Sequence, residues 1–114
     1  MKFEIEVISE EILPAIRSLI AREMRESYGL TQEEIARKTG MTQAAVSNYL
    51  NNSRADEKTA EKIQEDPQIQ VLLENAAALA AKNQDYSKEI SRIISNIRDK
   101  GILKEKFEDT DKVI

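Results

Sequence analysis

Residues 31–50 constrain the fold of this chain more than any other stretch, because they contain the signals for two short helices and a turn between them. Thr31 and Glu34 have the T-x-x-E spacing of a capping box, in which each side chain bonds to the backbone of the other residue at the start of a helix. Gly40 ends that helix, since glycine readily adopts the positive φ of a helix C-terminus. Thr42 then caps a second helix. The sequence therefore predicts two short helices joined by a tight turn.

The second of these helices, predicted over residues 43–50, has two faces of different chemistry. One face can pack against a core and consists of Ala45, Val46, Tyr49 and Leu50. The opposite face is uncharged and consists of Gln43, Ala44, Ser47, Asn48 and Asn51. Because charged residues make up 33% of the chain, an ordinary solvated face would be expected to carry Lys and Glu. Amides, hydroxyls and methyl groups suit the reading of base edges in the major groove of DNA, with an ordinary polar face as the alternative.

The stretch "TQEEIARKTGMTQAAVSNYLNN" resembles the helix-turn-helix of the lambda-repressor/Cro (Xre-type) family of transcriptional regulators. The matching positions are Gln32, Ala36, Gly40, Val46 and Tyr49. The resemblance is strongest over residues 30–52 and extends loosely over about residues 10–81. It implies an all-α fold, with a lambda-repressor-like five-helix DNA-binding domain and a C-terminal helical extension. The helix over residues 43–50 would be the recognition helix and would lie in the major groove.

The same resemblance implies roles for individual residues. The residues that would face the bases are Thr42, Gln43, Ala44, Ser47 and Asn48. The residues that would contact phosphates are Gln32, Asn51, Asn52, Ser53 and Arg54. Gln32 would also brace Gln43. Arg37 and Lys38 either add diffuse attraction for DNA or form a solvated surface pair.

The preceding stretch, "ILPAIRSLIAREM", also resembles a group of archaeal Xre-type regulators. Members of that group often carry a Cys-x-x-Cys pair in their last helix, near the position of Ser91 and Ile94 in this chain. The resemblance implies that any metal or redox chemistry of such a pair is lost here.

The remainder of the chain divides into three parts. Residues 1–8 alternate charged and apolar side chains, which predicts a short strand or an extended arm. Residues 9–82 contain the helix-turn-helix and the helices around it, the last of which begins at the Asp66-Pro67 pair. Residues 83–114 form the helical extension, and its charge-dense tail after Gly101 is expected to fray or to dock only weakly.

The extension contains an apolar stripe that is too rich for a solvated helix. Its members are Tyr86, Ile90, Ile93, Ile94 and Ile97. One recognition helix reads only a few base pairs, and two-fold symmetric proteins of this type read half-sites about 34 Å apart. We therefore expect a homodimer on a pseudo-palindromic operator, with the stripe as the candidate dimerisation surface. Two alternatives are that the stripe packs within one subunit, and that the protein is an adaptor or antitoxin whose C-terminal helices bind a partner protein.

Composition restricts the chemistry that the chain can perform. It has no histidine and no cysteine, which removes the commonest general base and the commonest metal ligands, and it has no Gly-rich phosphate loop. We expect no catalytic residues, no metal site and no cofactor. The net charge of −4 is uneven, because residues 12–54 carry six basic and four acidic side chains while the remainder carries −6. Without a signal-peptide pattern or an apolar run of about 18 residues, the protein is expected to be soluble and cytoplasmic.

Overall fold

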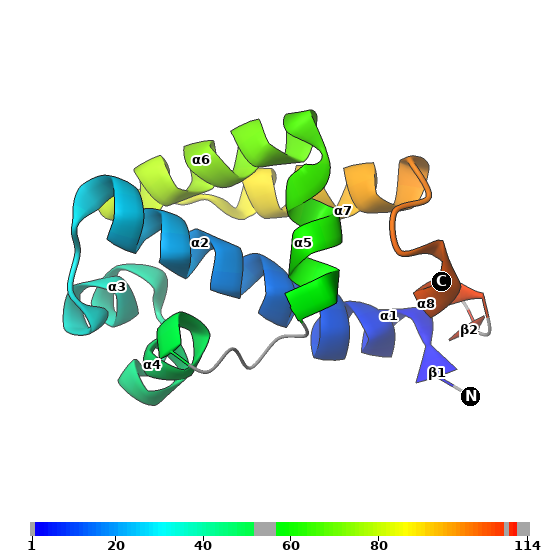
Figure 1. The fold of residues 1–114 in the computed structure, drawn as a ribbon, viewed down its shortest axis with the longest axis horizontal. Helices are drawn as coiled ribbons and strands as arrows, with labels where there is room; N and C mark the ends of the chain where they lie inside the picture. The colour runs from blue at the N-terminus through cyan, green and yellow to red at the C-terminus, as the bar shows by residue number, and fades with distance from the viewer. Residues whose placement is uncertain (1, 52–56, 109, 112–114) are drawn as a thin grey trace.

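The computed structural model describes residues 2–51, 57–108 and 110–111, and the last two by their backbone alone (Figure 1). The elements in chain order are β1 (Lys2–Phe3), α1 (Glu4–Val7), the π-helical turn η1 (Ile8–Ile12), α2 (Leu13–Tyr28), α3 (Gln32–Thr39), α4 (Gln43–Asn51), α5 (Glu57–Glu65), α6 (Pro67–Ala81), α7 (Ser87–Asp99), α8 (Lys104–Phe107) and β2 (Thr110–Asp111). The fold is all-α, as predicted, apart from the pair of two-residue strands. Over the described ranges, no helix is both long enough and apolar enough to cross a membrane.

Helix α2 occupies the middle of the molecule, with α6 on one side and the α3–α4 pair on the other (Figure 1). Its core face is completely buried and includes Ala15, Ile16, Ile20, Ala21 and Met24. The neighbouring helices each contribute apolar side chains with no exposed surface, among them Ile35, Val46, Ile63 and Ile69. Because burial of one such side chain contributes about 1.5–3 kcal/mol, this shared core fixes the five helices α2–α6 as one unit.

The predicted start of α6 is confirmed. The Asp66 carboxylate accepts a hydrogen bond from the Ile69 N–H at 3.0 Å, and Pro67 occupies the first turn. The Lys100 ammonium lies 2.9 Å from the same carboxylate, and this interaction, followed by the Ile69 N–H, lowers the pKa of Asp66. The cap of α6 is thereby tied to the end of α7.

Helix α7 packs along α6 inside the subunit. The small side chains of Ala76 and Ala80 are fully buried, which allows close approach of neighbouring helices. Ile93 and Ile97 of α7 are also fully buried. Part of the apolar stripe predicted for dimerisation, Ile93 and Ile97, therefore belongs to the core of a single subunit.

The strand or arm predicted for residues 1–8 is wrong beyond Phe3, because residues 4–12 are helical. An alternating strand would place Ile5 and Val7 on one face, but Ile5 is 58% exposed while Val7 is 1% exposed. The Glu6 carboxylate accepts a hydrogen bond from the Phe3 N–H at 3.0 Å and so caps the helix. Burial of Val7 in the core outweighs the local alternation, and helical structure begins at Glu4.

The two ends of the described chain meet at one side of the molecule (Figure 1). β1 pairs in parallel with β2, the Lys106 ammonium lies 2.8 Å from the Glu11 carboxylate, and Arg98 forms an ion pair with Glu4. We call the residues of these two ion pairs, Glu4, Glu11, Arg98 and Lys106, the terminal clasp. The weak docking predicted for the tail is wrong for its described part, since Leu103 is buried in the core.

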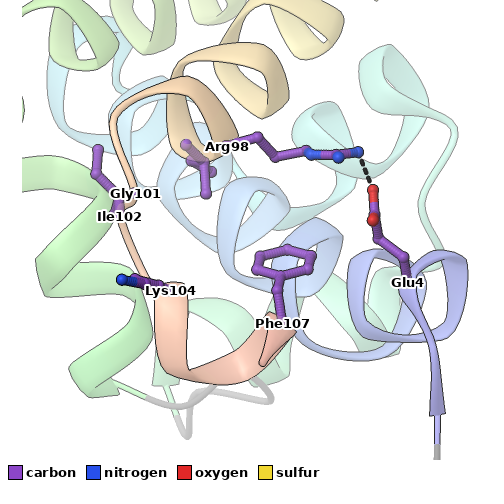
Figure 2. Close-up of a pocket in the computed structure, with 7 residues that line it drawn as sticks. Glu4, Arg98, Gly101, Ile102, Lys104 and Phe107 are labelled. Carbon is purple, nitrogen blue, oxygen red and sulfur yellow. Dashed lines mark ion pairs between the residues drawn. The ribbon is translucent and has the colours of Figure 1, made fainter. Parts of the chain in front are cut away.

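A cavity of about 210 Å³ lies inside this junction (Figure 2). Its lining consists of Glu4, Ile97, Arg98, Gly101, Ile102, Lys104 and Phe107. Figure 2 shows the Glu4 carboxylate and the Arg98 guanidinium pointing toward each other, with the Phe107 ring below them. The Glu4–Arg98 ion pair joins α1 to α7 at this cavity.

Candidate functional site

The turn between α3 and α4 is built by the hydrogen bonds that its sequence predicts. The Glu34 N–H donates to the Thr31 hydroxyl at 3.2 Å, and the Thr31 N–H donates to the Glu34 carboxylate at 3.0 Å. The second of these bonds, made by the Thr31 backbone, is the main cause of the lowered pKa of Glu34. Gly40 has φ of +75° and its N–H donates to the carbonyl of Ala36 at 3.0 Å. The Thr42 hydroxyl accepts from the Ala45 N–H at 3.1 Å and caps α4.

Helix α4 has the two faces that the sequence predicts. Ala45, Val46 and Tyr49 are buried. Of the opposite face, Thr42, Gln43, Ala44 and Asn51 are exposed, and Ser47 and Asn48 are half-buried. The Asn51 amide donates to the Ser47 hydroxyl at 3.3 Å, so these two polar groups already interact along the helix. The result is one accessible helical face with amide, hydroxyl and methyl groups and no charge.

Gln32 and Gln43 come together beside this face. Both line one surface hollow, together with Arg25 and the residues from Gly29 to Glu33. The hollow thus contains both the first residue of α3 and the first residue of α4. Gln32 is half-buried and Gln43 is exposed.

Arg25 is a residue of this surface that the sequence did not single out. It is exposed near the end of α2, and it lines both the hollow of Gln43 and a second hollow that includes Asn51. Its guanidinium is a cation beside an otherwise uncharged face. The sequence shows two basic residues before the motif, Arg22 and Arg25. Their positions alone do not indicate which of the two faces α4.

Arg22 differs from Arg25 because it is half-buried and its guanidinium interacts with α4 and α5. Its guanidinium forms an ion pair with Glu57 of α5, and its Nε lies 3.5 Å from the carbonyl oxygen of Tyr49. A cation near the last turn of a helix interacts favourably with the negative end of the helix dipole. Arg22 therefore fastens the end of α4 to α2 and α5.

Three of the predicted phosphate contacts, Asn52, Ser53 and Arg54, lie outside the described residues. Asn51 is exposed at the last position of α4. Arg37 is exposed, as either reading of its role requires. Lys38 is instead half-buried, and its ammonium donates to the carbonyl of Ala81 at 2.9 Å. Neither of the two roles predicted for the Arg37–Lys38 pair, diffuse attraction for DNA or a solvated surface pair, includes this contact.

The five dimerisation candidates, which are Tyr86 just before α7 and four isoleucines on α7, fall into two groups. Ile93 and Ile97 are completely buried within the subunit. Tyr86, Ile90 and Ile94 are half-buried and keep some accessible surface. Within the part of the chain that the structure describes, no three carboxylates gather as ligands for a metal ion.

Comparison with known proteins gives one match. Residues 22–71 match the model of a protein family described as helix-turn-helix. The matched segment begins within α2, contains α3, α4 and α5, and ends within α6. Searches of the curated proteins and of the solved structures gave no match.

Proposed function

Since residues 22–71 form a helix-turn-helix domain of the lambda-repressor (Xre) type, a DNA-binding regulatory family, we propose that this protein binds a pseudo-palindromic operator as a homodimer. Helix α4 enters the major groove, and Thr42, Gln43, Ala44, Ser47 and Asn48 contact base edges. Gln32, Arg25 and Asn51 contact phosphates at its margins, together with Asn52, Ser53 and Arg54.

The observation that supports this proposal best is the uncharged, accessible face of α4 on a helix that is fixed at both ends. The Thr42 cap holds its first turn, and Arg22 holds its last turn. A Gln or Asn amide can form two hydrogen bonds with adenine, a Ser hydroxyl can donate or accept, and an Ala methyl can contact the thymine methyl. Such contacts need a rigid helix, because each hydrogen bond tolerates only a few tenths of an ångström.

The homodimer rests on the geometry of DNA and on the accessible part of α7. Two half-sites about 34 Å apart require two recognition helices in a fixed relation. Ile90 and Ile94 are half-buried and neighbour each other on one face of α7. We propose that these two side chains contribute to an isologous contact between subunits.

Selection of binding sites from random double-stranded DNA tests the proposal, with the mass of the complex measured in the same buffer. The expected outcome is an inverted repeat whose half-sites are centred about one helical turn apart, bound by two chains, with affinity that falls as salt rises. Absence of any enriched sequence would contradict the proposal. A chain that stays monomeric and shows no salt-dependent DNA binding would instead favour an adaptor or antitoxin that binds a partner protein.

A further inference from the structure

The loop between α6 and α7 lies against the end of α3, next to the turn that leads into α4. The Tyr86 hydroxyl donates to the carbonyl of Thr39 at 3.4 Å. The Lys38 ammonium donates to the carbonyl of Ala81 at 2.9 Å and lies 3.5 Å from the side-chain oxygen of Asn83. We call these five residues, Lys38, Thr39, Ala81, Asn83 and Tyr86, the turn brace.

The chemistry of the turn brace follows from the helix ends that meet there. The last carbonyls of α3 and α6 lack helical partners and carry the negative ends of two helix dipoles. Lys38 belongs to the last turn of α3, and its ammonium binds the last carbonyl of α6, so its positive charge offsets the negative ends of both helices. The Tyr86 hydroxyl is the donor to the Thr39 carbonyl, and burial raises its pKa. Asn83 has φ of +59°, a conformation that Asn tolerates better than most residues, and this lets the loop turn back toward α3.

Thr39 connects the turn brace to the start of α4. Its carbonyl is held by Tyr86, and its hydroxyl donates to the Ile35 carbonyl at 2.6 Å. The same hydroxyl lies 3.4 Å from the N–H of Met41, the residue before the Thr42 cap. Only residues 40–42 separate Thr39 from α4, so a displacement of Thr39 moves the first turn of the helix and Gln43 with it.

We propose that Tyr86 and Lys38 are positioning residues for base readout, which makes the C-terminal extension part of the DNA-reading apparatus. This inference rests on the proposed function. Base-edge hydrogen bonds depend on the placement of α4, whereas attraction between phosphates and cations tolerates small displacements. Loss of the turn brace therefore weakens binding to the selected site more than binding to unrelated DNA.

Tyr86→Phe removes one hydroxyl and keeps the ring. Loss of one such hydrogen bond is expected to reduce affinity for the selected site about two- to tenfold. Affinity for unrelated DNA and the slope of affinity against salt should equal those of the wild type. Tyr28→Phe is the matched control, because Tyr28 is 46% exposed on α2, and it should leave both affinities unchanged.

Lys38→Met is the second variant, since it keeps the length of the side chain and removes the ammonium. Arg37→Met is its control, because it removes one positive charge from the neighbouring exposed position and so measures the loss of general attraction for DNA phosphates. Lys38→Met should lower the ratio of specific to unrelated affinity, Arg37→Met should not, and Lys38→Arg should restore part of the ratio. If Tyr86→Phe and Lys38→Met both keep the wild-type ratio, or lose specific and unrelated binding equally, the positioning role is wrong.

Amide hydrogen exchange of the free protein separates this inference from the proposed function. In Tyr86→Phe, the amides of Ala45 and Val46 in the first turn of α4 should exchange faster, while the Ile69 amide at the cap of α6 should not change. If the wild type selects no DNA sequence, the proposed function fails, and exchange still decides whether the brace holds α4. Unchanged exchange at Ala45 and Val46 would overturn the inference.

Discussion

Gln43 is the residue whose side chain contributes most to the proposed readout, because it is exposed at the first position of α4 and lies beside Gln32. Gln43→Ala should weaken binding to the selected site by about 1–3 kcal/mol and relax the preference at one base pair. Fluorescence anisotropy with the selected site and with single-base variants measures both effects. Gln64→Ala, at an exposed position of α5, is the control. Equal affinities of Gln43→Ala and wild type would exclude Gln43 from readout.

Thr42 has a structural role that can be separated from its proposed base contact. Its hydroxyl caps α4 by accepting from the Ala45 N–H. Thr42→Val keeps the shape and removes this acceptor, so the free energy of unfolding should fall by about 1 kcal/mol in urea denaturation. Thr42→Ser keeps the cap and should stay within a few tenths of a kcal/mol of the wild type. If Thr42→Ser destabilises as much as Thr42→Val, the cap is not the stabilising contact.

At the scale of elements, two adjacent positions of α7 differ: one packs in the core of the subunit, and the other belongs to the proposed contact between subunits. Ile93 is completely buried in the subunit, so Ile93→Ala should lower the free energy of unfolding by about 2–5 kcal/mol. Ile94 is half-buried, so Ile94→Ala should cost less in the subunit and raise the dimer dissociation constant instead. Denaturant unfolding and sedimentation over a range of concentrations distinguish the two effects. A wild-type dissociation constant for Ile94→Ala would remove this residue from the proposed interface.

The elements that the sequence predicted correctly depend on local signals. Thr31 and Glu34 are three residues apart, and Gly40 ends its helix by its own backbone conformation, so these positions needed no knowledge of the fold. Residues 4–8 were mistaken because a short alternation of apolar residues fits a strand, and burial of Val7 is decided by contacts with distant helices.

The site shows the same division between local and distant contacts. The two faces of α4 follow from helical spacing and could be predicted. The contact between Tyr86 and Thr39 spans 47 positions, and the place of Arg25 beside Gln43 depends on how α2 crosses α3 and α4. No pattern within a single segment could indicate them.

At the scale of the whole molecule, the terminal clasp makes stability depend on pH. A hydrogen bond from Lys106 lowers the pKa of the Glu11 carboxyl below its ordinary value of 4.5. Because the folded-state pKa is below the unfolded value, the pair stabilises the fold above pH 4.5 and loses this effect as pH falls through the folded-state pKa. Lys106→Met should therefore lower the melting temperature at pH 7, and its difference from the wild type should shrink as the pH falls below 4.5. Lys82→Met, at an exposed position, is the control, and a difference from wild type that does not shrink in acid would contradict this account.

The clasp also fixes an order of assembly for the chain. Glu11 and Lys106 are 95 positions apart, and closing a loop of that length in a flexible chain costs about 4 kcal/mol of entropy from its length alone. The two ion pairs have partly exposed side chains, so each contributes on the order of 1 kcal/mol and does not offset that cost by itself. The ends of the chain can therefore join only after α2, α6 and α7 have packed and brought them near. We therefore expect the clasp to be the last part of the molecule to form and the first to open, with the helix-turn-helix complete before it closes.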